Sequence, residues 1–163
     1  MKHTLIEPLN EFINPRKRDI KKKIKIGEFE RAKEKIDPKA LEFLKYLVYP
    51  NRIQPIIKND QVLINIGMDL IIRDSIYSSG SLPDYIAFNE IFGDFVLIDV
   101  FSTMKGFPHI IHKDFYAANQ NFSDLEFFPE EIHGDAYLRG SFPEKIGEKD
   151  IRAISNIKGK ILI

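Results

Sequence analysis

A seven-residue pattern that returns through the second half of the chain restricts its fold more than any other feature. One copy, IFGDFVL, runs from Ile91 to Leu97. The other ungapped copies begin at Ile66, Ile111 and Ile132, a copy with lysine in place of aspartate begins at Ile157, and a looser copy spans 146–153 around Asp150. Positions one, five and seven are apolar and position four is polar. Self-similarity at a fixed period is typical of repeat proteins, whose units stack and share a core.

The alternation within each copy predicts a β-strand. Residues two apart lie on the same face of a strand, so positions one, three, five and seven point inward and the aspartate points outward. A glycine at the inward third position leaves room for a neighbouring segment. The residues expected in the core are Ile91, Phe95, Leu97, Phe115, Ile132, Leu138, Ile146, Ile157 and Ile161.

A second signature, proline followed three residues later by isoleucine, occurs at Pro83, Pro108, Pro129 and Pro143. Proline cannot donate to a β-ladder, so we expect it in the turn before each strand. The aspartates at positions 69, 94, 114, 135 and 150 lie 25, 20, 21 and 15 residues apart. These spacings predict a tapering solenoid whose last turns are too short for a helix.

The charge of the chain divides at about residue 50. Residues 1–50 hold 13 Lys and Arg against 8 Asp and Glu, and residues 51–163 hold 11 against 16. The clearest helix is expected over 37–48, because Asp37 suits the N-cap, Pro38 suits the first helical position and Pro50 stops the helix. Shorter helices are expected over 28–36 and around 5–13. We interpret 1–50 as a basic helical region that covers the sheet edge near 62–64, and 51–163 as the repeat region.

The Gly-Asp-Phe strands and the Phe-Pro-x-x-Ile segments between them resemble the degenerate leucine-rich-repeat-like proteins of bacteria and bacteriophages, over about residues 60–163. The resemblance implies an α+β fold, with an N-terminal helical cap followed by an irregular leucine-rich-repeat-like β-solenoid. It also implies a scaffold for protein recognition without conserved chemistry. The asparagine that usually follows each strand in such repeats is absent from most copies. The alternative is a globular antiparallel α+β domain whose internal similarity arises by chance.

Stacked repeats would place equivalent residues in columns on the outward face, about 4.8 Å apart. The columns hold Phe92, His112 and His133, then Asp94, Asp114 and Asp135, then Val96, Tyr116 and Tyr137. Aromatic residues are enriched at interfaces, so these nine residues form the predicted protein-binding surface. The alternative is that each aspartate only begins its strand and meets water or a turn amide. The histidines and aspartates have suitable donor atoms for a metal, but no ligand spacing supports one, and we predict no metal site.

The segment from Arg16 to Lys25 offers a second candidate site. Its basic residues are Arg16, Lys17, Arg18, Lys21, Lys22, Lys23 and Lys25. Such a run could contact nucleic-acid phosphates, although no aromatic residue is interleaved for base stacking. The other interpretations are a solvated helix face, or a basic surface that docks on the acidic half of another copy or of a target protein.

Several classes of protein are not indicated. The chain has no cysteine, no glycine-rich phosphate loop and no nucleophile motif, so we predict neither an enzyme nor a cofactor. We read no signal peptide and no membrane span, and expect a cytoplasmic location. The 26 isoleucines against 12 leucines are typical of an AT-rich genome, such as that of a phage or a low-GC bacterium. We therefore expect a phage or bacterial protein that binds and modulates, or inhibits, a host protein.

The last three residues, Ile161 to Ile163, are apolar and lie within a strand pattern. An apolar terminal strand would leave an unpaired sheet edge, which natural proteins usually cover. This pattern predicts a homodimer, or strand addition to a partner, through the C-terminal strand.

Overall fold

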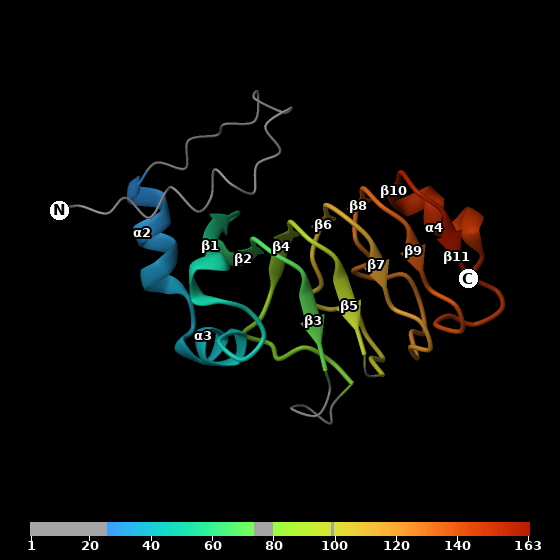
Figure 1. The fold of residues 1–163 in the computed structure, drawn as a ribbon, viewed down its shortest axis with the longest axis horizontal. Helices are drawn as coiled ribbons and strands as arrows, with labels where there is room; N and C mark the ends of the chain where they lie inside the picture. Colours follow the sequence, from blue (N-terminus) through green and yellow to red (C-terminus); the bar gives the residue numbers. More distant parts are fainter. Residues whose placement is uncertain (1–25, 74–79, 99) are drawn as a thin grey trace.

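The computed structural model, which describes residues 26–73, 80–98 and 100–163, shows a β-solenoid with two sheets (Figure 1). Sheet A consists of β1 (Ile53–Lys58), β2 (Gln61–Ile66), β4 (Phe88–Ile91), β6 (Ile110–Ile111), β8 (Glu131–Ile132) and β10 (Asn156–Ile157), in that order. Sheet B consists of β3 (Leu70–Ile72), β5 (Phe95–Leu97), β7 (Phe115–Tyr116), β9 (Ala136–Tyr137) and β11 (Ile161–Leu162). The basic segment Arg16 to Lys25 and the helix expected around 5–13 lie outside the described residues.

Every strand pairing is parallel except that of β1 with β2. The chain passes from a strand of sheet A through a short corner into a strand of sheet B. It then returns through a longer segment to the next strand of sheet A, one coil further along the solenoid. This topology makes the antiparallel α+β alternative wrong.

Each seven-residue copy is two short strands and not one continuous strand. In the copy from Ile91 to Leu97, residues 92–94 form a corner between β4 and β5, and the same three-residue corner separates the strands of every other coil. The expectation of an unbroken strand was wrong because the backbone turns at the third and fourth positions, which are Gly-Asp in two coils and Met-Asp, Lys-Asp or Gly-Lys in the others. The apolar positions before and after the corner still face inward, since both sheets line the same interior.

The core runs the length of the solenoid between the two sheets and the return segments. Seven of the nine expected core residues are buried, whereas Ile146 and Ile161 are partly buried and pack against the core. Return segments contribute further aromatic residues. The Phe107 ring packs edge-on against Phe95, with 5.3 Å between ring centroids, and Phe95 stacks on Phe115 at 5.4 Å. Aromatic stacking therefore links successive coils through the interior.

The four prolines of the Pro-x-x-Ile signature do not occupy the same position in their return segments. The N–H groups of Ile86 and Ile146 bond to the carbonyls of Pro83 and Pro143, so these prolines begin a turn. Pro108 instead follows the equivalent turn, in which the Phe107 N–H bonds to the Met104 carbonyl. Pro129 likewise follows a turn, that between Leu125 and Phe128. The expected common register of the four copies is therefore wrong.

The last return segment contains helix α4 (Glu148–Ile154), so the expectation of short, helix-free last turns is also wrong. Asp150 is not a member of the aspartate series. It lies in the first turn of α4 and accepts a hydrogen bond from the Gly147 N–H at 2.9 Å. The true successor of Asp135 is Lys160, 25 residues further on. The solenoid thus does not taper.

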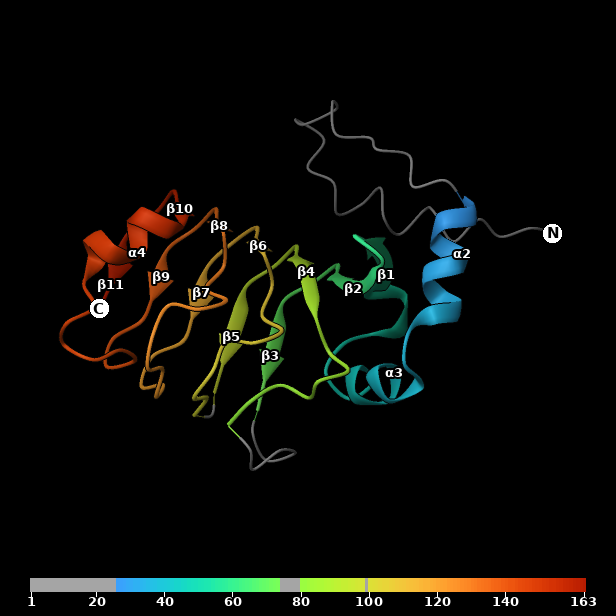
Figure 2. The same cartoon turned by 180° about the vertical axis from the view of Figure 1, so that it is seen from behind.

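Two helices precede the sheets. α2 (Ile26–Lys35) and α3 (Pro38–Leu44) lie at the N-terminal end of the solenoid (Figures 1 and 2). The Asp37 side chain caps α3 by accepting from the Lys39 N–H at 2.8 Å, as expected. Phe43 and Leu44 of α3 belong to the continuous core. The edge of sheet A near 62–64 is paired with β1, which follows the 3-10 turn η1 (Pro50–Arg52), so a strand and not a helix occupies this edge.

The other edge of sheet A, along β10, is covered by a side chain from α4. The Asn156 and Lys158 N–H groups bond to the preceding coil, so the Ile157 carbonyl faces the outer edge. Arg152 donates from Nη1 to the Ile157 carbonyl at 3.0 Å and from Nη2 to the Gly159 carbonyl at 3.1 Å. The Arg152 guanidinium is thus bonded to the carbonyl oxygens that an added strand would need as acceptors.

Candidate functional site

A ladder of carboxylates fixes the corners of successive coils. Oδ1 of each aspartate accepts the backbone N–H of the equivalent corner residue one coil further on. The four bonds are Asp69 from Asp94 at 2.8 Å, Asp94 from Asp114 at 3.0 Å, Asp114 from Asp135 at 2.8 Å, and Asp135 from Lys160 at 2.7 Å. The aspartates therefore satisfy turn amides, which was the simpler of the two interpretations of this column. Charge-assisted bonds to backbone N–H groups are stronger than neutral ones.

The second residue of the corner is glycine in three coils, at Gly93, Gly134 and Gly159, and there the preceding coil leaves no space for a side chain. Met68 and Lys113 occupy this position in the other two coils. A Cβ on Gly134 would overlap Asp114 Oδ1 and lie 2.7 Å from the carbonyl carbon of Lys113. Cβ atoms on Gly93 and Gly159 would meet the corresponding aspartate of the coil before them. Glycine does leave room for a neighbouring segment, but at the corner and not within a strand.

The outer face of sheet B carries three columns of side chains. The strand register aligns Ile71, Val96, Tyr116, Tyr137 and Leu162 in the central column. Two residues earlier lie Asp69, Asp94, Asp114, Asp135 and Lys160, and two residues later lie Arg73, Ile98, Ala118 and Arg139. Buried and solvent-accessible residues alternate along each strand, which places all three columns on the same outward face.

Two tyrosines form the centre of this face. The rings of Tyr116 and Tyr137 are parallel and stacked, with 4.5 Å between centroids. Their hydroxyls donate to Oδ2 of Asp114 at 3.1 Å and of Asp135 at 3.4 Å. The hydrogen bond to Asp114, together with partial burial and the nearby carboxylates, raises the pKa of Tyr116 to about 12. Partial burial and the charge of Asp135 raise the pKa of Tyr137. Both hydroxyls thus remain protonated, and their hydrogen bonds to the aspartates hold the two rings in the stacked arrangement.

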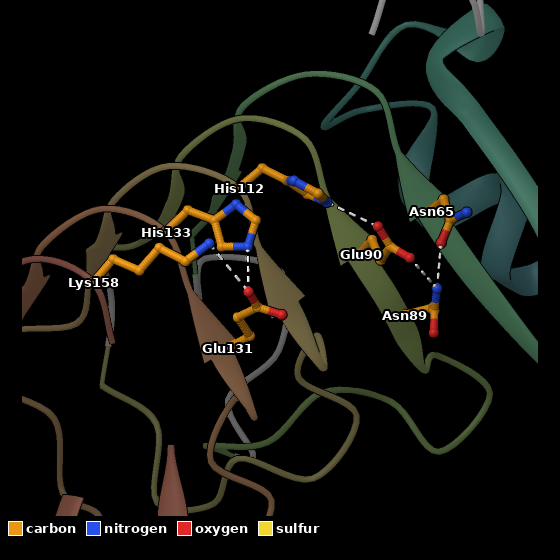
Figure 3. Close-up of polar contacts among 7 residues, drawn as sticks. All are labelled: Asn65, Asn89, Glu90, His112, Glu131, His133 and Lys158. Atoms are coloured by element: carbon orange, nitrogen blue, oxygen red, sulfur yellow. Dashed lines mark hydrogen bonds and ion pairs between the residues drawn. The ribbon is translucent and has the colours of Figure 1, made fainter. Parts of the chain in front are cut away.

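The predicted histidine column lies at the corners, where it forms a polar row with residues of sheet A (Figure 3). His112 Nε2 lies 2.8 Å from Glu90 Oε2, and His133 Nε2 lies 2.7 Å from Glu131 Oε1. The His112 and His133 rings meet edge-on at 4.8 Å, and His112 stacks on Phe92 at 4.5 Å. We call this set of five residues the histidine row.

Neighbours extend the histidine row at both ends. Lys158 Nζ lies 3.3 Å from Glu131 Oε1 in the last coil. In the first coils, buried Asn89 donates to Asn65 at 2.9 Å and to Glu90 at 3.2 Å. Burial opposes the ionisation of Glu131, but hydrogen bonds from His133 and Lys158 outweigh it and lower the Glu131 pKa. Burial lowers the pKa of His133 in spite of its bond to Glu131.

The corner separates the nine predicted protein-binding residues into two groups. Asp94, Val96, Asp114, Tyr116, Asp135 and Tyr137 lie on the outer face of sheet B, whereas Phe92, His112 and His133 lie in the histidine row. Sequence reasoning missed Arg73 and Arg139, which extending the alternation by two residues would have found. It also missed Glu90 and Glu131, each of which directly precedes the first isoleucine of its copy.

Other kinds of site have little support in the described part of the chain. No group of three or more histidine, aspartate or glutamate side chains there converges to hold a metal ion. A shallow hollow of about 480 Å³ lies along β10 and α4 and is lined mainly by Arg152, Ile154, Ser155 and Asn156. No helix within 26–73, 80–98 and 100–163 is long and apolar enough to cross a membrane.

These features define a repeat protein of the β-solenoid class, with a flat aromatic and acidic face on one sheet and a polar row at the corner. No protein-family model, no curated protein and no solved structure matches the chain.

Proposed function

We propose that the protein is a protein–protein interaction module whose binding surface is the outer face of sheet B, bordered by the histidine row. The observation that carries this proposal is the stacked pair Tyr116 and Tyr137. Two rigid, partly accessible aromatic rings flanked by carboxylates provide contact area at low entropic cost, and such residues are enriched at interfaces.

The partner in this proposal is a protein of the host cell, which the chain modulates or inhibits in the host cytoplasm. The isoleucine-rich composition supports a phage or low-GC bacterial source. We also propose that α2, α3 and β1 serve as an N-terminal cap, since Phe43 and Leu44 continue the core beyond the first coil. The parallel sheets and coils of 20 to 25 residues support the leucine-rich-repeat-like interpretation.

The test compares two pairs of tyrosine substitutions. Tyr116→Ser with Tyr137→Ser removes the stacked pair, and Tyr46→Ser with Tyr49→Ser removes two tyrosines that are 69% and 68% exposed outside sheet B. The expected result is that a protein captured from host lysate by the wild type and the control is lost with the first pair. Equal capture by all three folded proteins would contradict the proposal.

A second candidate function is nucleic-acid binding through the segment Arg16 to Lys25. The observation that favours it is the density of charge, with seven basic residues in ten. Each phosphate contact releases counterions, so binding should weaken steeply with salt. A gel shift at low salt that is lost on reversing the charges of Lys21, Lys22 and Lys23 would support this function, and the absence of a shift at low salt would exclude it.

A further inference from the structure

We propose that the outer face of sheet B binds the same face of a second copy of this chain, with a two-fold axis parallel to the solenoid axis. This inference rests on the proposed function in that the face binds protein, and it adds a second copy of the chain as a partner besides the host protein. It follows from the order of the three columns, which makes the face complementary to itself.

The charges of the face are distributed unequally between its two borders. The column before the central one carries Asp69, Asp94, Asp114 and Asp135, with Lys160 in the last coil, and the column after it carries Arg73 and Arg139 at its two ends. Both borders lie two residues from the central column, or roughly 7 Å at the rise of a β-strand. The central column, with its stacked tyrosines, therefore lies between an acidic border and a border that is basic at its two ends.

Two ways of placing a second copy face to face with its strands aligned have two-fold symmetry, and their electrostatics differ. An axis parallel to the strands reverses the coils and places this column against itself. Lys160 then faces Asp69, but carboxylate faces carboxylate in the three middle coils, which is unfavourable because like charges in apposition repel. An axis parallel to the solenoid keeps the coils in order and reverses the strands. It places each acidic column opposite the arginine-bearing column of the other copy.

The second arrangement defines specific pairs. Asp69 faces Arg73 of the second copy in the first coil, and Asp135 faces Arg139 of the second copy in the fourth. Each pair occurs twice because the interface is isologous. Val96 and Tyr116 lie on the axis and face their own equivalents. Facing sheets lie about 10 Å apart, a separation that an arginine and an aspartate can span together.

The carboxylates that the second copy would neutralise have few cations nearby. Among residues 26–73, 80–98 and 100–163, Asp94, Asp114 and Asp135 form no ion pair, and Asp69 has only Lys113, with 3.5 Å between Nζ and Oδ1. The described helices lie toward the two ends of the solenoid and not over the middle of sheet B (Figures 1 and 2). Among the described residues, no helix thus covers the middle of this face.

The size of the face determines the strength of association. Five strands about 4.8 Å apart and five residues in length give roughly 400 Å² per copy. That area is at the low end for specific interfaces, of which the standard size is about 800 Å² per partner. We therefore expect a weak dimer that forms at concentrations of tens to hundreds of micromolar and weakens with added salt.

The test uses sedimentation of the full chain over a concentration series. The variant Arg73→Glu with Arg139→Glu should reduce dimerisation at least tenfold, because each glutamate then faces an aspartate. The control Lys33→Glu with Lys35→Glu, on exposed positions of α2, makes the same change in net charge and should leave dimerisation unchanged. Equal association of the two double variants would overturn the proposal.

Cross-linking tests the position of the axis, and the chain suits it because it contains no cysteine. Val96→Cys places two thiols opposite each other across the axis, on sheets about 10 Å apart, where a short bis-maleimide should join two copies. Ile154→Cys, at a position 50% exposed on α4, should give no dimer. Cross-linking at position 154 but not at 96 would indicate association through the C-terminal end and overturn the face-to-face arrangement.

Failure of this inference is distinguishable from failure of the proposed function. A chain that stays monomeric at 1 mM, yet loses a host partner with the Tyr116 and Tyr137 pair, refutes the dimer and leaves the binding face intact. A chain that dimerises as described, with no loss of a host partner in that pair, supports the dimer alone.

Discussion

Replacing Gly134 by alanine tests whether the corner ladder holds the coils together. Gly134 is not among the glycines with positive φ, which are Gly80, Gly106 and Gly140, so its backbone accommodates alanine without torsional strain. The cost must then come from contact. The new Cβ would overlap Asp114 Oδ1 and press on the Lys113 carbonyl group at 2.7 Å, and neither backbone nor a bonded carboxylate can easily move.

The magnitude follows from two contributions. Overpacking by one methyl group costs about 1–3 kcal/mol. If the Asp114 carboxylate is displaced from the Asp135 N–H, the lost charged hydrogen bond adds about 1.5–3 kcal/mol. The sum, about 2.5–6 kcal/mol, corresponds to a fall in the melting temperature of roughly 5–24 °C, at about 2–4 °C per kcal/mol for a chain of this length.

The measurement is urea and thermal denaturation followed by circular dichroism, with Gly147→Ala as the matched control. A Cβ on Gly147 meets nothing closer than Asp150 Oδ2, at 3.8 Å, so this variant should lose no more than about 1 kcal/mol. The double variant with Asp114→Ala should be less destabilised than the sum of the two single variants, because the overlap with the carboxylate is gone. A Gly134→Ala protein as stable as the control would refute the reasoning.

Three further predictions concern single side chains. Asp114→Ala should cost about 1.5–3 kcal/mol in urea unfolding, whereas Asp114→Asn, which retains an acceptor for the Asp135 N–H, should cost less than half as much; equal losses would indicate that charge and not the bond matters. His133 should titrate in NMR below its ordinary pKa. Its folded pKa is lowered, so the unfolded chain binds the proton first and stability should decline as the pH falls from about 7 through the folded pKa; His133→Gln should flatten this decline, and a midpoint above the ordinary value would contradict it. Arg152→Ala uncovers the outer carbonyls of β10 and should increase concentration-dependent association in light scattering; a variant that associates like the wild type would show that Arg152 does not protect this edge.

The apolar periodicity of the sequence was enough to predict the solenoid and most of its core. Ile91, Phe95 and Leu97 are buried because the alternation of inward and outward side chains continues on both sides of the corner. Ile91 ends a strand of sheet A, and Phe95 and Leu97 begin and end a strand of sheet B. The helix capped by Asp37 was predictable for the same reason, since its signals are local.

The corner itself could not be predicted from alternation. Whether Gly-Asp continues a strand or turns it depends on a bond between Asp114 Oδ1 and the Asp135 N–H, which lies 21 residues away in the chain. The strand predicted around Asp150 was wrong for a related reason. Its local pattern resembled a strand, but the Gly147 and Asp150 capping arrangement favours a helix. The acidic column was predictable as a column, whereas its role as a set of amide acceptors required the three-dimensional structure.

The uneven spacing of the ladder has a consequence for how such a chain can grow. The corners are always three residues long, while the return segments absorb all the variation between coils of 20 and 25 residues. A whole unit, such as the 20 residues from Asp94 to Lys113, therefore begins and ends at superposable points. Duplicating that unit in the gene would lengthen the protein by about 4.8 Å and add one more rung without changing either end.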